Sequence, residues 1–189
     1  MSRSVFLTFD DGPHPDHTKS VLDVLKAEGV TATFFVVGRN VETHGTRLLE
    51  RAVKEGSGVG NHSLTHPKLP DLSLDRVREE IAGCDTLIAP FQQGRKLFRP
   101  PYGAKNAAVE GLMTDAGYKL VMWDVDTIDW SKDNQPTKWV DIGLKQFGDK
   151  PRAVVLNHDL HSGTAASLAE FIRRIRALGE VTFGTPDKL

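Results

Sequence analysis

The sequence predicts an α/β protein whose mainly parallel strands close into a barrel. Strand-like and helix-like segments alternate along the whole chain, which is typical of repeated βαβ units. About seven segments read as strands, and no glycine-rich phosphate-binding loop follows the first of them. The number of strands and the lack of that loop favour a barrel over an open dinucleotide-binding sheet.

The predicted strands are short runs rich in β-branched and aromatic residues, such as TATFFVV at residues 31–37. In chain order they cover residues 5–9, 31–37, 58–63, 96–103, 119–127, 153–159 and 180–184. The helices between them are predicted from apolar residues at helical spacing. They cover residues 18–28, 43–54, 72–89, 106–116, 136–147 and 164–178.

The 72–89 segment has the most complete helix pattern. Ser73 is suited to cap its N-terminus, and the spacing of four apolar residues places them on one side. These residues are Leu74, Val77, Ile81 and Leu87.

Length and composition describe a single globular domain over residues 1–189, with 39% hydrophobic and 26% charged residues. The net charge of −1 and the lack of a basic run exclude nucleic acid as an expected partner. No apolar stretch approaches the roughly 18 residues of a membrane span. Cys84 is the single cysteine, so an internal disulfide is excluded and we expect a small packing residue on a helix.

Strand-like sequence begins at Val5, which leaves no room for a signal peptide in the first four residues. We therefore expect either a protein that stays in the cell or a domain cut from a longer, exported chain. The sequence is compatible with both settings.

Six of the predicted strands finish in unusual polar or aromatic residues. The carboxyl ends of strands form the functional face of parallel α/β folds, so we expect these six ends to converge on one site. In chain order they read FDDGP, GNHSLTHP, FRPPYG, DVDTIDW, LNHDLH and, more weakly, FGTP.

A metal site is predicted from His62 and His66, which lie four residues apart in HSLTH. Taken alone, such a pair is as often two ordinary loop histidines. Asp10 and Asp11 at a neighbouring strand end favour the metal, because two imidazoles and one carboxylate suit zinc. Three protein ligands leave positions open for water and substrate, as in catalytic zinc centres.

The paired aspartates Asp10 and Asp11 are explained if one binds the metal and the other acts as a base on metal-bound water. Successive strand residues point to opposite faces, so both can serve one site only where the strand ends and the backbone turns. We expect Gly12 to supply the unusual dihedral angles of that turn and Pro13 to end the strand ladder.

Other candidates are weaker as single residues. His158 ends an apolar strand, and Asp129 is placed to orient it as a general acid. Arg99 is either a surface residue or the partner of an aspartate that must stay ionised. Trp130 belongs either to the core or to a pocket wall. We expect the remaining histidines to lie on the surface or only to support the site, namely His14, His17, His44 and His161.

In this order, TFDDGP, HSLTH, RPPYG, DTIDW and LNH resemble the five motifs of the polysaccharide deacetylase family, carbohydrate esterase family four. The resemblance covers nearly the whole chain and includes the chitooligosaccharide deacetylase homology domain. It implies a distorted (β/α)7-type barrel, in agreement with the number of predicted strands.

The resemblance also implies roles for the polar residues of the first three motifs. Asp10 would be the general base, held by Arg99. Asp11 would be a metal ligand together with His62 and His66.

The remaining roles concern the substrate and the acid. The backbone N–H of Tyr102 would join the metal in stabilising the oxyanion, which makes Tyr102 a substrate-binding residue as well. Trp130 would form a wall of the pocket, and Leu156 would contact the acetyl methyl group. His158 would be the acid, tuned by Asp129.

The implied function is the metal-dependent removal of acetyl groups from glycans that contain N-acetylglucosamine, such as chitin oligomers or peptidoglycan, with acetylxylan as a further substrate. Zinc is the expected cofactor, and cobalt or nickel would fit the same ligands. The resemblance implies an extracellular or cell-envelope setting, and we expect a monomer.

Three alternatives stay open at this point. Acetylxylan esterase activity would be the main function if the leaving group were an alcohol. A non-catalytic carbohydrate-binding relative would bind saccharide without releasing acetate. An iron(II) oxygenase also uses two histidines and a carboxylate, and HPD at residues 14–16 supplies that pattern, although the α/β alternation argues against it.

Overall fold

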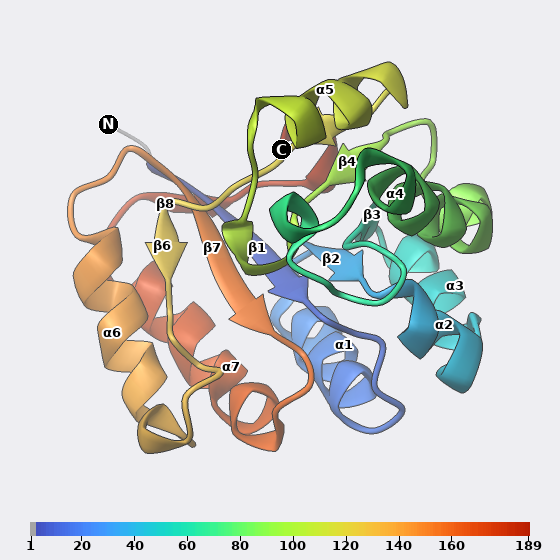
Figure 1. The fold of residues 1–189 in the computed structure, drawn as a ribbon. Coiled ribbons are helices and arrows are strands. Elements are labelled where there is room, and N and C mark those ends of the chain that lie inside the picture. The colour runs from blue at the N-terminus through green and yellow to red at the C-terminus, as the bar shows by residue number, and fades with distance from the viewer. Residues whose placement is uncertain (1–2) are drawn as a thin grey trace.

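The structure, a computed structural model, describes residues 3–189 and contains one parallel sheet that curls into a distorted barrel, as predicted (Figure 1). The strand order is β5–β4–β3–β2–β1–β7–β6, and β8 pairs with β1 beside this path. The strands are β1 Arg3–Asp10, β2 Ala32–Val36, β3 Gly58–Asn61, β4 Leu97–Phe98, β5 Lys119–Leu120, β6 Val125–Asp126, β7 Arg152–His158 and β8 Val181–Phe183.

The helices surround the strands (Figure 1). They are α1 His17–Glu28, α2 Gly38–His44, α3 Arg47–Lys54, α4 Leu74–Ile88, α5 Ala107–Asp115, α6 Lys138–Phe147 and α7 Ser162–Arg176. Helix α7 packs against α1 and α6, and α4 packs against α2 and α5. The single helix expected over 43–54 is instead α2 and α3, which Gly45 separates with φ +77°.

Side chains of β1 alternate between two faces of the strand, and Asp10 lies on the face that does not pack against the helices. Leu7 and Phe9 belong to the main hydrophobic cluster with the helices, whereas Phe6 belongs to a second cluster inside the barrel. Asp10 lies on the same face of the strand as Phe6, because side chains alternate between faces. In the register of the two strands, Asp10 of β1 is opposite His158 of β7.

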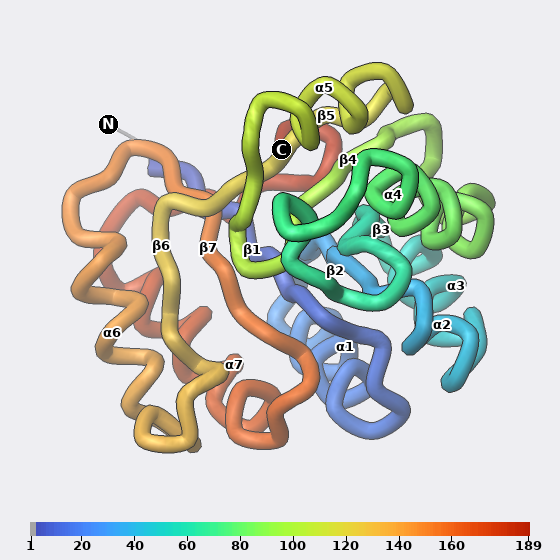
Figure 2. Tube along the Cα trace, viewed as in Figure 1, coloured from blue at the N-terminus to red at the C-terminus, as the bar shows by residue number. Residues whose placement is uncertain are grey.

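The segment predicted as one strand over 119–127 is in fact two strands at opposite edges of the sheet. Val121 N–H donates to Phe98 O on the β4 side, and Asp124 N–H donates to Val154 O on the β7 side. Figure 2 shows the chain crossing from β5 to β6 between these edges. One extended segment therefore closes the barrel by pairing first with one edge and then with the other.

Cys84 lies fully buried on α4, as expected of a packing residue. Over residues 3–189, no helix is long and apolar enough to cross a membrane.

Candidate active site

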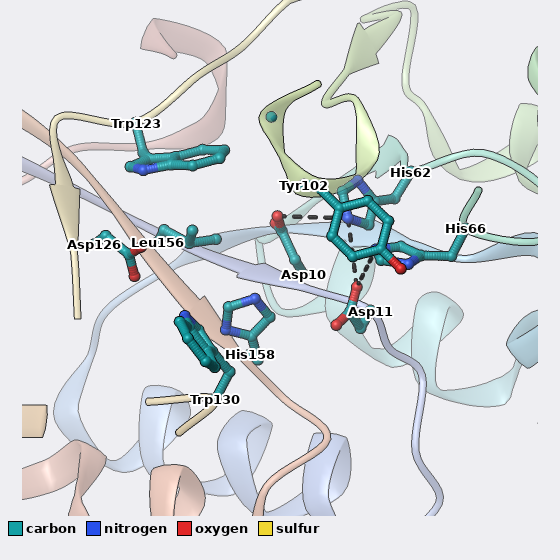
Figure 3. A pocket seen from close by; sticks show the side chains of 11 residues that line it. Asp10, Asp11, His62, His66, Tyr102, Trp123, Asp126, Trp130, Leu156 and His158 are labelled. Atoms are coloured by element: carbon teal, nitrogen blue, oxygen red, sulfur yellow. Dashed lines mark ion pairs between the residues drawn. The ribbon is translucent and has the colours of Figure 1, made fainter. Parts of the chain in front are cut away.

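A pocket of about 440 Å³ opens at the carboxyl ends of the central strands (Figure 3). Its acidic and histidine residues are Asp10, Asp11, His62, His66, Asp126 and His158. The rest of its lining is Tyr102, Gly103, Trp123, Trp130 and Leu156. Asp10 lies between the metal candidates on one side and His158 on the other (Figure 3). All candidate residues that line this pocket come from strand ends that are far apart in the sequence.

Asp10 is held by Arg99 inside the barrel. Arg99 Nη1 donates to Asp10 Oδ1 at 2.7 Å and to Thr8 Oγ1 at 2.8 Å. Arg99 is fully buried and its guanidinium stacks over Phe35, 4.3 Å from the ring centroid. The surface alternative for Arg99 is therefore wrong, and Asp10 has a buried cationic partner on one of its two oxygens.

The turn after β1 brings Asp11 to the same pocket as Asp10, but not in the way expected. The unusual dihedral belongs to Asp11, at φ +78°, whereas Gly12 does not adopt a positive φ. Gly12 is needed for a different reason, because a Cβ atom there would lie 2.3 Å from Asp159 Oδ2. The predicted unusual dihedral angles of Gly12 were therefore wrong. Glycine is required there by close contact with Asp159, a residue far away in the chain that the local sequence does not reveal.

Asp11, His62 and His66 place three ligand atoms within 4.8 Å of one another. Asp11 Oδ1 lies 3.4 Å from His62 Nε2 and 3.1 Å from His66 Nε2, and it is buried without a hydrogen-bond partner. His62 Nδ1 lies 2.6 Å from the carbonyl of Arg99, so that Nδ1 donates and Nε2 is free to bind a metal. These contacts fit a divalent cation.

The electrostatics of Asp11 also suit a metal ligand. Burial by itself raises the pKa of the Asp11 carboxyl, but the two neighbouring imidazoles outweigh burial and hold this pKa well below its usual range. Asp11 is therefore ionised at any pH at which the protein would bind a metal.

His158 is paired with the fully buried carboxylate of Asp129. His158 Nδ1 lies 2.8 Å from Asp129 Oδ1, and Asp129 Oδ2 accepts hydrogen bonds from His158 N–H and Thr164 Oγ1. Burial lowers the pKa of His158, but Asp129, with help from Asp10 and Asp11, overcomes burial and raises it to about 9. The metal-free protein therefore holds His158 as a cation at neutral pH.

Tyr102 and Trp130 are the most exposed parts of the lining. Their side chains are 69% and 55% exposed, so Trp130 is not a core residue. The ring of Tyr102 stands edge-on to that of His66, with centroids 4.7 Å apart. Leu156 lines the pocket from β7, beside His158 and Trp130 (Figure 3).

Three residues near the site were not found from the sequence. Trp123, which lies between β5 and β6, and Asp126, the last residue of β6, both line the pocket. Asp126 did lie within a polar strand end, which was a usable signal. Asp159 is fully buried behind the turn and accepts a hydrogen bond from Thr18, and burial raises the pKa of its carboxyl to about 7.

The remaining histidines lie outside the pocket lining, although two of them border its strand ends. His14 and His17 stack with centroids 4.0 Å apart, and His44 is exposed. His17 Nδ1 lies 2.7 Å from Leu160 O, and His161 lies 6.3 Å from His158 between ring centroids.

A family model described as "Polysaccharide deacetylase" matches residues 1–121. The chain is 39% identical over 193 residues to the peptidoglycan-N-acetylglucosamine deacetylase PgdA of Listeria monocytogenes, an alignment that covers 100% of this chain and 39% of that protein. It is 38% identical over 158 residues to the chitooligosaccharide deacetylase of Rhizobium leguminosarum bv. trifolii, with 83% of this chain and 72% of the relative covered. The chain thus spans about two fifths of the Listeria relative's length.

A solved structure of the peptidoglycan deacetylase PdaC from Bacillus subtilis is similar in fold as well as sequence. The two chains superpose with a TM-score of 0.86 at 36% identity, over 99% of this chain and 89% of the other.

Proposed function

The chain belongs to the polysaccharide deacetylase family, a family of hydrolases, and we propose that it removes acetyl groups from glycans containing N-acetylglucosamine in a metal-dependent reaction. One observation carries the proposal. A single pocket holds a carboxylate–bis-histidine cluster, a second carboxylate paired with Arg99, and a histidine paired with a buried aspartate.

Asp11, His62 and His66 would hold the metal, for which zinc is the first choice and cobalt or nickel are compatible. The ion would polarise the acetyl carbonyl and lower the pKa of a water molecule at the site. The protein side of the reaction then depends on two proton transfers and on how the acetyl group is held.

Asp10 is the proposed base. Its Oδ1 is occupied by Arg99, whereas its Oδ2 is directed towards the histidine cluster, 3.7 Å from His62 Nε2. Asp10 would take a proton from the attacking water as the new carbon–oxygen bond forms. The charge-assisted hydrogen bond from Arg99 fixes the orientation of the Asp10 carboxylate for that step.

His158 is the proposed acid, on the other side of Asp10. With Nδ1 bound to Asp129, the Nε2–H of His158 is available to protonate the sugar nitrogen as the carbon–nitrogen bond breaks. Acetate and a free amine are the products. Protonation matters because an amine is a poor leaving group from an amide.

The acetyl group itself would be positioned by the pocket lining. The backbone N–H of Tyr102 is proposed to donate to the developing oxyanion, a contact typically worth on the order of 10²–10³ in rate. Leu156 would contact the acetyl methyl group, and the exposed rings of Tyr102 and Trp130 would contact the sugar.

Chitin oligomers and peptidoglycan are the proposed substrates, because relatives of both kinds align over most of this chain. The test is acetate release from N-acetylglucosamine oligomers, peptidoglycan and acetylxylan, before and after removal of metal with a chelator. We expect release that stops on chelation and returns when zinc is added.

Release that continues unchanged after complete metal removal would contradict the proposal. Release from acetylxylan alone would make the protein an esterase, and saccharide binding without any release would make it a non-catalytic relative.

A further inference from the structure

Both histidines of the cluster lie on the short loop that follows β3, residues 62–66, whose backbone is unusual. Ser63 has φ +69° and His66 has φ +63°, a conformation that residues other than glycine seldom adopt. Such a conformation persists only where the surrounding structure holds it in place. The position of both imidazoles therefore depends on whatever holds the loop.

Hydrogen bonds of Asn61 and Ser63 hold the first part of the loop. Asn61 Nδ2 donates to Ile81 O of α4 at 3.0 Å, and Asn61 Oδ1 accepts from Ser63 N–H at 2.8 Å. Ser63 Oγ in turn accepts from His66 N–H at 3.0 Å. These contacts fix Ser63 and His66 relative to β3, but none of them involves Thr65.

Thr65 is bound by the carboxylate of Glu80 on α4. The Thr65 N–H donates to Glu80 Oε2 and the Thr65 hydroxyl donates to Glu80 Oε1, each at 2.7 Å. Glu80 is only 2% exposed, and no Lys, Arg or His among residues 3–189 forms an ion pair with it. Burial of a carboxylate without a cationic partner costs free energy of folding. The two hydrogen bonds from Thr65 offset part of this cost, which indicates that the contact between Glu80 and Thr65 is specific.

Resting on the function proposed above, we infer that Glu80 is a positioning residue for the metal site. By taking both donors of Thr65, Glu80 fixes the residue directly before His66 and so holds His66 Nε2 at its distance from His62 and Asp11. Only a carboxylate presents two acceptors in this way, whereas an amide presents one acceptor and one donor. Residues that support metal ligands in this manner typically contribute about 10–100-fold to metal affinity.

The test measures zinc affinity of the whole chain by competition with a chromophoric chelator, together with the visible spectrum of the cobalt-substituted protein. We expect Glu80→Gln to weaken zinc binding about 10–100-fold and to change the cobalt spectrum. Thr65→Val, which keeps the N–H donor and loses the hydroxyl, should weaken it about tenfold. Thr65→Ser keeps both donors and should bind within about twofold of the wild type.

Glu79→Gln is the matched control. Glu79 is the preceding residue of α4, and its side chain is 60% exposed. Among residues 3–189 its ion-pair partner is Arg76 on the same helix. We expect its zinc affinity and cobalt spectrum to equal those of the wild type. Thermal unfolding of each metal-free variant shows the temperature range in which all of them are folded, and binding is compared within that range.

A purely structural role predicts a different result. Glu80→Gln would then unfold at a lower temperature but bind zinc with wild-type affinity and an unchanged cobalt spectrum, which would overturn the inference alone. If Glu80→Gln does not fold, wild-type affinity in Thr65→Val overturns it instead. A wild-type chain that binds no zinc would overturn the proposed function, and this inference with it.

Discussion

The floor and the rim of the pocket are built in opposite ways. On the floor, Asp10, Arg99, His62 and Asp129 are each at most 3% exposed and are bonded to groups on distant strands. On the rim, the rings of Tyr102 and Trp130 are more than half exposed, as solvent-facing side chains of the loops that follow β4 and β6. The difference indicates that the proposed reacting groups are positioned in advance by the fold, whereas the proposed sugar contacts stay open to solvent.

The strongest test of the floor is Asp10→Asn beside Asp11→Asn. Removal of the proposed base should lower the rate of acetate release at least about 10³-fold while zinc remains bound, because Asp10 is not a proposed ligand. Asp11→Asn should instead weaken zinc binding, measured by equilibrium dialysis. Loss of zinc in Asp10→Asn, with zinc retained in Asp11→Asn, would reverse the two roles.

Unfolding is the control for Asp10→Asn, because Arg99 would lose its buried partner. Breaking a buried ion pair by removing one charge costs about 3–5 kcal/mol, so urea denaturation must show that the variant is folded in the assay.

His158→Ala tests the proposed acid, which pairs with Asp129 of the floor. General acid catalysis contributes roughly 10²–10⁴ in rate, and an amine needs protonation more than a sugar alcohol does. The variant should therefore lose more activity on N-acetylglucosamine oligomers than on acetylxylan, compared through kcat on each substrate. Equal losses on both would contradict the role of His158 as the acid.

Asp129→Asn tests whether the Asp129 carboxylate sets the pKa of His158, through the pH dependence of the reaction. The pKa of His158 is raised to about 9 in the metal-free protein mainly by Asp129, and only the protonated form can act as an acid. Without the Asp129 charge this pKa should fall towards or below 6.5, so the alkaline limb of kcat/KM should move to lower pH. An alkaline limb at unchanged pH would show that another group sets it.

The His158–Asp129 pair also stabilises the folded, metal-free protein to an extent that depends on pH. The pKa of His158 is higher in the folded chain than in the unfolded one. The stabilisation is therefore complete below about pH 6.5 and is lost as pH rises through about 9. Urea denaturation across this range should show the loss in the wild type and little of it in Asp129→Asn.

The smallest effect is expected on the rim. Trp130→Ala removes an exposed ring and should raise KM for N-acetylglucosamine oligomers about three- to tenfold, with little change in kcat or zinc affinity. A fall in kcat with unchanged KM would show that Trp130 acts on the reacting groups, and the separation of floor from rim would then be wrong.

Much of this architecture was predictable because its signals are local. Periods of two and 3.6 residues mark strands and helices, and turns after strands mark the functional face, so the α/β barrel and the convergence at Asp11, His62 and His66 followed from short stretches of sequence. The segment over 119–127 was predicted as one strand because its composition is strand-like throughout. Its division into β5 and β6 depends on two edges of the barrel that the segment itself does not encode.

Helix α4 shows most clearly what tertiary structure alone decides. The helical pattern predicts that Leu74 lies on the buried side of α4, yet Leu74 is 45% exposed. Glu80, a residue type that normally faces solvent, is instead only 2% exposed. A charged side chain is expected to face solvent unless a specific partner compensates its burial. That partner, Thr65, lies 15 residues away, as Asp159 lies far from the Gly12 turn it packs against. The sequence by itself determined the strand ends and the polar residues proposed to carry the chemistry. Packing between distant segments decided what holds those residues in place, because such contacts leave no periodic pattern in the sequence.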